Sequence, residues 1–149
     1  MTFSNAGCHL PHGMSYAVSG LVRDFRAPDY PGAEPMVPHG MSVMLNAPSV
    51  YRFSAPACPQ RHLEGAECLG ADTRGASAAD AGEVLAKHLV GMMRSTEFPG
   101  GLAYIGYGEN DVDALTEGAF PQRRVIGNAP RDVSKEDLKG IFRGAMKYW

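Results

Sequence analysis

Apolar residues recur at intervals of three and four along much of this 149-residue chain, and this spacing restricts the fold more than any other feature. Residues at that spacing share one face of an α-helix, which a globular domain buries. The pattern predicts helices at residues 58–69, 77–94, 109–119 and 134–146. In residues 77–94 the expected buried stripe consists of Ala81, Val84, Leu85, His88, Leu89 and Met92.

Capping residues stand at the start of two of these segments. Ser77 with Asp80, and Ser134 with Asp137, have the spacing of a capping box in which Asp replaces the usual Glu. Residues 102–107, LAYIGY, are the one candidate strand, and they could equally form a helix or a turn. The chain is therefore predicted to be all-α, with short segments containing glycine and proline between the helices.

The pentapeptide PHGMS occurs twice, at residues 11–15 and 38–42, and each copy begins a helical pattern. The intervening residues 23–38 contain four prolines and a glycine, so they are predicted to form an irregular excursion on the surface. A histidine at a helix start, followed by glycine, is accessible from one side. Two such helices lying side by side would direct His12 and His39 into one cleft.

Neutral imidazole is a common ligand for zinc and iron, but these metals normally need three or four protein ligands. The sequence contains no D-x-x-x-H or H-E-x-x-H motif that would complete such a set. Cys8 could add a soft ligand, and His9 lies three residues before His12, although Pro11 between them makes a regular turn less certain. The alternative, that His12 and His39 merely begin two similar helices, stays open from spacing alone.

The remaining histidines and glycines carry weaker signals. His62 follows Arg61 in an amphipathic segment and is expected to be a partly exposed surface residue. His88 lies on the apolar stripe and is expected in the core, with one ring nitrogen hydrogen-bonded. Residues 106–110, GYGEN, lack the third glycine of a dinucleotide-binding loop. From the residues alone, the chain lacks the further metal ligands and the dinucleotide-binding loop that a self-contained enzyme of this kind would need.

Composition and charge argue against several classes of protein. A net charge of −2 gives no basic footprint for nucleic acid or for an anionic membrane surface. No run approaches the ~20 apolar residues of a membrane-spanning helix, and the first residues do not resemble a signal peptide. Cys8, Cys58 and Cys68 form no CxxC pair, which indicates reduced thiols in the cytoplasm, or in the mitochondrial matrix of a eukaryote.

Three stretches resemble a known family along nearly the whole chain: NAGCHLPHGMSYAVSGLVRDF, VPHGMSVMLNAPSVYRF and RHLEGAECLGADTR. With GLAYIGYGENDVDAL and PQRRVIGNAP, they are similar to the carboxy-terminal half of the iron-containing (group III) alcohol dehydrogenases, above all to the hydroxyacid-oxoacid transhydrogenase branch. The resemblance implies that residues 1–149 form the family's all-helical carboxy-terminal domain. The amino-terminal α/β domain that binds the nucleotide would then be absent, and the chain would be a fragment, inactive alone.

The resemblance also implies a metal site. His12 and His39 match the last two ligands of a bound Fe²⁺, with Zn²⁺ as the alternative, and an upstream Asp and His would complete the set. Tyr16 stands where many alcohol-specific relatives carry another histidine, so it becomes a candidate substrate contact and favours the transhydrogenase branch. The metal would lower the pKa of the substrate hydroxyl. Hydride would pass from a 4-hydroxybutyrate-type substrate to NAD(P), and then to a 2-oxo acid.

Two alternatives to this oxidoreductase interpretation stay open. One is a non-catalytic helical protein that keeps the same fold for assembly or partner binding, and the other is an unrelated two-histidine metal-binding bundle. The expected partner is a small hydroxy acid or alcohol, and neither nucleic acid nor a membrane is expected. Association into a homo-oligomer would follow if the chain exposes an apolar cleft face.

Overall fold

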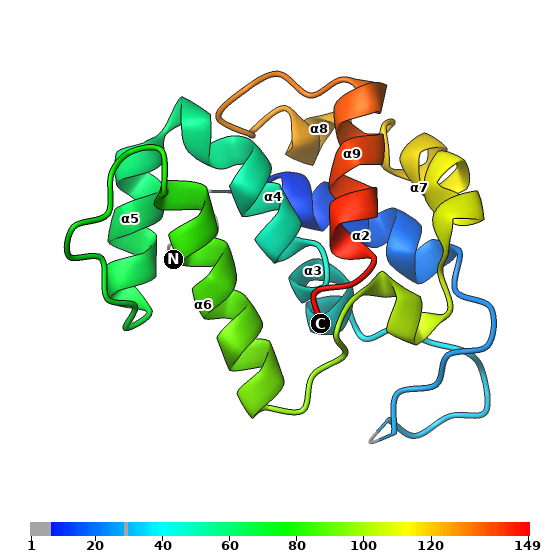
Figure 1. Ribbon diagram of the computed structural model, residues 1–149. Helices are drawn as coiled ribbons and strands as arrows, with labels where there is room; N and C mark the ends of the chain where they lie inside the picture. Colours follow the sequence, from blue (N-terminus) through cyan, green and yellow to red (C-terminus); the bar gives the residue numbers. More distant parts are fainter. Residues whose placement is uncertain (1–6, 29) are drawn as a thin grey trace.

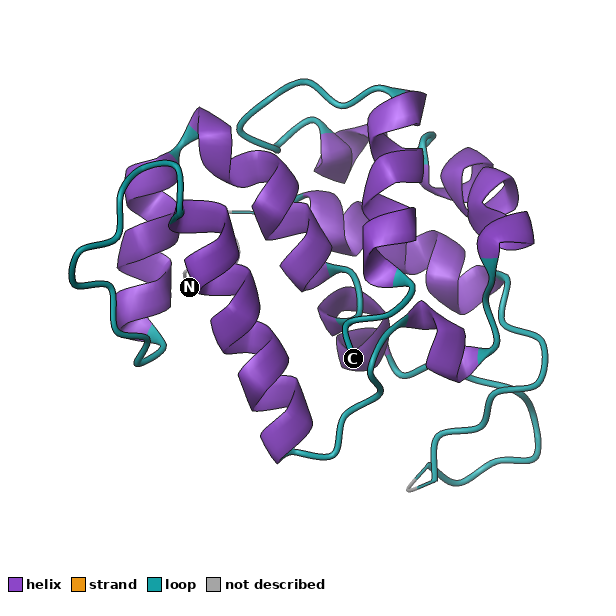
Figure 2. Ribbon diagram, in the orientation of Figure 1, coloured by secondary structure: helices purple, strands orange, loops and turns teal. Residues whose placement is uncertain are grey.

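The computed structural model describes residues 7–28 and 30–149. In this part of the chain the regular structure is helical, and its only β feature is an isolated bridge between Arg26 and Met36 (Figure 2). The α-helices are α2 (Leu10–Gly20), α3 (His39–Met44), α4 (Ala47–Ser54), α5 (Pro59–Cys68), α6 (Ala81–Ser95), α7 (Val112–Ala119), α8 (Arg123–Ile126) and α9 (Lys135–Ala145). The 3-10 helices are η1 (Ala55–Ala57), η2 (Leu102–Ile105) and η3 (Glu109–Asp111). The prediction of an all-α fold is confirmed.

Each helix predicted from the apolar spacing is present, with its ends shifted by a few residues. Residues 58–69 contain α5, and residues 77–94 contain most of α6. Residues 109–119 divide into η3 and α7, and residues 134–146 contain α9. The candidate strand at residues 102–107 is η2 followed by a turn, so the helical alternative left open for it is the one observed.

The two predicted capping boxes have different outcomes. Ser134 caps α9: its hydroxyl accepts a hydrogen bond from the Asp137 backbone N–H at 3.1 Å, and its own N–H donates to the Asp137 carboxylate at 2.9 Å. Ser77 likewise donates its backbone N–H to Asp80 at 2.9 Å. Helix α6 begins only after Asp80, however, so the Ser77–Asp80 pair orders the turn that precedes the helix.

The buried face of α6 differs from the predicted stripe. Met93 is 1% exposed whereas Met92 is 40% exposed, so the buried face of the last turn is rotated by one residue position from the expected one. Helix α4 approaches α6 closely at this point: a Cβ on Gly82 would lie 3.1 Å from the Cα of Arg52 and 3.1 Å from the carbonyl oxygen of Tyr51. Since only a small residue fits there, α6 turns its small residues toward α4, and Met93 follows on the same face.

The chain packs around α2, which contacts α3, α7 and α8 (Figure 1). Helices α4, α5 and α6 form a second group, in which α4 and α5 each pack on α6, and α4 also contacts α9. The main core surrounds α2 and includes the fully buried side chains of Leu10, Met14, Leu45, Leu115, Leu138 and Phe142. A smaller cluster between α4, α5 and α6 consists of Ala47, Ala66, Leu85 and Leu89.

Two further predictions concern the surface. The proline-rich segment 23–38 joins α2 to α3 as a long loop that projects from the helices, as expected (Figure 1). Its described residues are mostly exposed, although Ala27, Val37 and Pro38 are buried. Within the described residues, every helix is too short or too polar to cross a bilayer.

Candidate metal centre

The structure brings His12 and His39 together although 27 positions separate them in the sequence. Helices α2 and α3 pack against each other, and the two imidazole ring centroids lie 5.4 Å apart with 56° between the ring planes. Two imidazoles bound to one tetrahedral zinc ion at Zn–N distances of about 2.0 Å would have ring centres roughly 5 Å apart. The separation therefore fits a pair of ligands for one ion.

The repeated pentapeptide builds the same local structure twice. The Ser15 hydroxyl donates a hydrogen bond to the His12 carbonyl at 2.8 Å, and the Ser42 hydroxyl donates to the His39 carbonyl at 2.8 Å. Both serines are buried, with exposed fractions of 1% and 0%. Each hydroxyl thus satisfies a carbonyl in the first turn of its helix and fixes the backbone that carries the imidazole.

The two glycines of the repeat have different roles despite their identical sequence context. A Cβ on Gly13 would lie 2.5 Å from Cγ1 of Ile126, so glycine at this position allows α8 to pack against α2. A Cβ on Gly40 would meet nothing within 4 Å. The open approach beside the histidine, expected at both copies, is therefore present only at His39.

Burial favours the neutral imidazoles that can bind a metal. Burial, and secondarily the neighbouring His39, lowers the pKa of His12 below its ordinary value of 6.5. Burial, followed by the charges of His12 and His62, lowers the pKa of His9 in the same way. The lowered pKa values of His12 and His9 favour the uncharged ring, which is the state that coordinates zinc or iron.

Among the described residues, His12 and His39 form a pair of candidate ligands without a third donor grouped beside them. Within residues 7–28 and 30–149, no three His, Cys, Asp or Glu side chains are grouped so that they could hold a metal ion. Cys8, the candidate soft ligand, is half-buried, and its backbone carbonyl accepts a hydrogen bond from the Asn128 side chain at 3.0 Å. The donor set therefore fits half of a typical zinc or iron site.

Tyr16 lies one helical turn after His12, and its side chain is 47% exposed. Residues at this spacing share a helix face, so the phenol and the His12 imidazole project on the same side of α2. Its exposure leaves the hydroxyl accessible to a ligand. The role of Tyr16 as a substrate contact stays a prediction.

The prediction for His62 is wrong, because this residue is only 7% exposed. Its Nδ1 lies 3.0 Å from the Cys58 carbonyl, and its Nε2 lies 2.8 Å from the Ser54 hydroxyl. A carbonyl only accepts, so Nδ1 carries the proton and Nε2 accepts from Ser54. The Tyr51 ring contacts the imidazole edge-on at 5.6 Å. The amphipathic pattern of α5 could not reveal this, since the partners lie on α4 and at the start of α5.

His88 and His9 complete the account of the histidines. His88 is half-buried rather than in the core, and its Nε2 donates to the Leu69 carbonyl at 2.9 Å, so the expected single hydrogen bond is present. His9 is the N-cap residue of α2, and its buried Nδ1 has no hydrogen-bond partner among the described residues. The three-residue spacing from His12 was the only signal for His9.

Comparisons with known proteins show which family the chain resembles. Residues 1–146 match the model of the Fe-containing alcohol dehydrogenase family, C-terminal. The chain is 50% identical over 147 residues to the mitochondrial hydroxyacid-oxoacid transhydrogenases of Homo sapiens and Pongo abelii. In each case the match covers 99% of this chain and 32% of the relative, so the chain spans about a third of these proteins.

Solved structures show the same fold. An alcohol dehydrogenase from Oenococcus oeni superposes with a TM-score of 0.80 at 27% identity, over 96% of this chain and 34% of that one. A 1,3-propanediol oxidoreductase gives a TM-score of 0.75 at 24% identity, over 91% of this chain and 32% of that one. Together with the match over residues 1–146, these likenesses show that the chain belongs to the iron-containing alcohol dehydrogenase family and corresponds to its C-terminal helical domain.

Proposed function

We propose that this chain is the metal-binding helical domain of a hydroxyacid-oxoacid transhydrogenase, in which His12 and His39 hold a divalent ion, Fe²⁺ or Zn²⁺. The observation that carries the proposal is the 5.4 Å separation of these two imidazole rings, built by the two copies of one pentapeptide. The 50% identity to the human transhydrogenase supports this branch of the family. Because the chain spans about a third of that relative, the activity proposed is that of the whole protein.

The residues of this chain would act by holding and orienting. A bound ion would supply Lewis-acid polarisation of a substrate hydroxyl. Burial lowers the pKa of His12, and the Ser15 and Ser42 hydroxyls fix the backbone at both histidines. Open space beside Gly40 leaves room for a substrate next to His39. The exposed Tyr16 phenol, one turn from His12, would donate a hydrogen bond to a substrate oxygen.

The proposed reaction transfers hydride between a small hydroxy acid, such as 4-hydroxybutyrate, and a 2-oxo acid by way of a nicotinamide cofactor. The sequence has no complete dinucleotide-binding loop, so we propose that NAD(P) is held mainly by residues outside this chain. The net charge of −2 supports a small-molecule partner over nucleic acid. The names of the human and Pongo abelii relatives place them in mitochondria, and we propose the mitochondrial matrix for this protein if its source is a eukaryote.

Calorimetric titration of zinc into the purified chain tests the proposal. Two imidazoles cannot close a four-ligand site, so we expect binding weaker than about 1 μM, abolished by His39→Ala. His88→Ala is the matched control, because His88 lies on α6 and should leave zinc binding unchanged. Sub-micromolar affinity would refute the half-site. We also expect no reduction of NAD⁺ by 4-hydroxybutyrate with this chain alone, and measurable turnover would contradict the need for further residues.

A further inference from the structure

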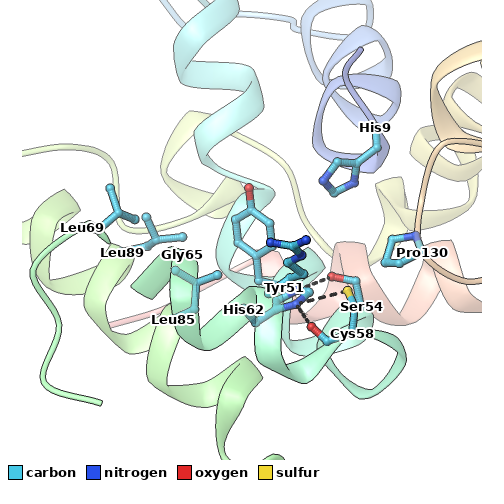
Figure 3. Close-up of a pocket in the computed structure, with 11 residues that line it drawn as sticks. His9, Tyr51, Ser54, Cys58, His62, Gly65, Leu69, Leu85, Leu89 and Pro130 are labelled. Atoms are coloured by element: carbon cyan, nitrogen blue, oxygen red, sulfur yellow. Dashed lines mark hydrogen bonds between the residues drawn. The ribbon is translucent and has the colours of Figure 1, made fainter. Parts of the chain in front are cut away.

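The loop that joins α8 to α9 borders two cavities of different character. The larger, of about 400 Å³, has Pro130 in its wall and is otherwise lined mainly by leucines and by tyrosine and histidine rings (Figure 3). Its one arginine, Arg61, is paired with Glu64 at 2.9 Å. The smaller cavity, of about 230 Å³, has both Arg123 and Arg131 in its wall. We call this second cavity the arginine pocket.

Both arginines of the pocket are held in place by an aromatic ring and a backbone carbonyl. The Arg123 guanidinium lies 3.8 Å over the Phe120 ring, and its Nη1 donates to the Val133 carbonyl at 3.4 Å. The Arg131 guanidinium lies 4.3 Å over the Phe53 ring, and its Nη1 donates to the carbonyl of that residue at 3.2 Å. A guanidinium carries five N–H donors, so each arginine keeps further donors for a ligand. Stacking restricts the guanidiniums in advance, which lowers the entropy lost when a ligand binds.

Neither guanidinium has a carboxylate partner. In the described part of the chain, the ion pairs between basic side chains and carboxylates involve neither Arg123 nor Arg131, and the adjacent Arg124 is also unpaired. One carboxylate, that of Asp132, lines the pocket and likewise forms no ion pair among the described residues. Three guanidiniums against one carboxylate leave an excess of two positive charges, which a doubly negative anion would balance.

We propose that the arginine pocket binds a phosphate group, either as the free ion or as the phosphate of a small monoester. Guanidinium N–H groups match phosphate oxygens in pairs, so Arg123 and Arg131 would each donate to the anion. The five non-hydrogen atoms of phosphate, at the ~30 Å³ of a liquid water molecule, need roughly 150 Å³, which the pocket of about 230 Å³ provides. Asp132 would weaken binding by repulsion. The inference is independent of the metal pair, because neither His12 nor His39 lines this pocket.

Nuclear magnetic resonance of the arginine Nε–H groups of the purified chain tests the proposal. The probe is inorganic phosphate at millimolar concentration and about pH 8, where it is mainly a dianion, with the ionic strength held constant by sodium chloride. We expect the Arg123 and Arg131 signals to shift at the same phosphate concentrations, while the Arg94 signal stays constant. No shift at Arg123 and Arg131, or equal shifts at all arginines as expected from charge screening, would overturn the proposal.

Two further probes define the anion and its source. Glycerol 3-phosphate that shifts the same signals at equal or lower concentration supports a phosphate monoester as the ligand, whereas a response to inorganic phosphate alone supports the free ion. Acetate has one negative charge and should bind at least about tenfold more weakly. Acetate that binds as tightly as phosphate would overturn the assignment of a phosphate site.

Asp132→Asn should strengthen phosphate binding, a result that misfolding cannot produce. Asp132 is exposed, and its side chain forms no hydrogen bond or ion pair within the described residues, so the fold should be unchanged. Removing its repulsion should raise phosphate affinity by about two- to fivefold. Asp24→Asn is the matched control, because Asp24 is also exposed and lies outside the arginine pocket. Equal phosphate affinity of the two variants would overturn the proposal.

Arg131→Gln removes one of the two guanidiniums and should weaken phosphate binding by at least about tenfold. Arg94→Gln is its matched control: Arg94 also stacks on a ring, that of Trp149 at 4.9 Å, but lies in the last turn of α6. Circular dichroism checks that both variants fold. A folded Arg131→Gln chain with unchanged phosphate affinity would overturn the proposal, and if this variant does not fold, the comparison of Asp132→Asn with Asp24→Asn decides.

Discussion

The two glycines of the repeated pentapeptide offer a matched pair of substitutions with opposite expected effects. In Gly13→Ala the new Cβ would lie 2.5 Å from Cγ1 of Ile126, 3.3 Å from its Cδ1 and 3.4 Å from Cγ2 of Val125. Ile126 and Val125 are 1% and 5% exposed, so neither can move into solvent without exposing apolar surface. Overpacking of this kind costs about 1–3 kcal/mol.

The better helix propensity of alanine offsets part of that cost, by up to about 1 kcal/mol at an interior position. Gly13→Ala should therefore lower the free energy of unfolding by about 1–2 kcal/mol, and the melting temperature by roughly 3–6 °C for a chain of this size. Gly40→Ala meets no neighbouring atom within 4 Å and should leave stability unchanged or raise it slightly.

Urea unfolding followed by circular dichroism measures both variants against the original chain. Equal stabilities of Gly13→Ala and Gly40→Ala would refute the assigned roles of the two glycines. A Gly13→Ala variant as stable as the original chain would show that α8 does not press on α2 at this point.

Three further substitutions or conditions test the fold and its electrostatics. Ser134→Ala removes the cap of α9 and should cost about 1 kcal/mol in urea unfolding, and an unchanged midpoint would contradict the capping role. Tyr148→Phe removes a hydroxyl that donates to the Leu45 carbonyl at 2.8 Å, so thermal unfolding should show a loss of about 1 kcal/mol, and no loss would show that water replaces the bond. Because the folded pKa values of His9 and His12 lie below 6.5, the unfolded chain binds protons more readily, so stability should be level above pH 6.5 and fall as the pH drops from there through the folded pKa values. His9→Gln should flatten this fall in urea titrations across that range, and a pH dependence as steep as that of the original chain would contradict burial as its cause.

The sequence allowed much of the fold to be predicted, because local periodicity reports which face a helix buries. All four helices predicted from apolar spacing are present, and the Ser134 cap forms as expected. The prediction that Met92 is buried was wrong. Gly82 of α6 faces α4, and the buried stripe of α6 is rotated so that Met93 is buried instead. That rotation depends on which helices meet, and apolar spacing within one helix carries no such information.

At the candidate site too, features that depend on a short stretch of sequence were predicted, whereas contacts between different helices were not. The repeated pentapeptide correctly indicated that His12 and His39 would lie together. The burial of His62 was missed because its partner Ser54 lies on a different helix, and no spacing within α5 records that contact. The different surroundings of Gly13 and Gly40 were equally hidden, since an identical pentapeptide meets α8 in one copy and open space in the other.

The central claim is that His12 and His39 bind one divalent ion together. Imidazole ¹⁵N signals of the purified chain, assigned through single His→Gln variants and followed during a zinc titration at about pH 7.5, test it most directly. We predict that the His12 and His39 nitrogens shift in parallel at the same zinc concentrations, while those of His62 and His88 stay constant. A zinc response in only one of the pair, or a larger response at His62 or His88, would contradict the claim.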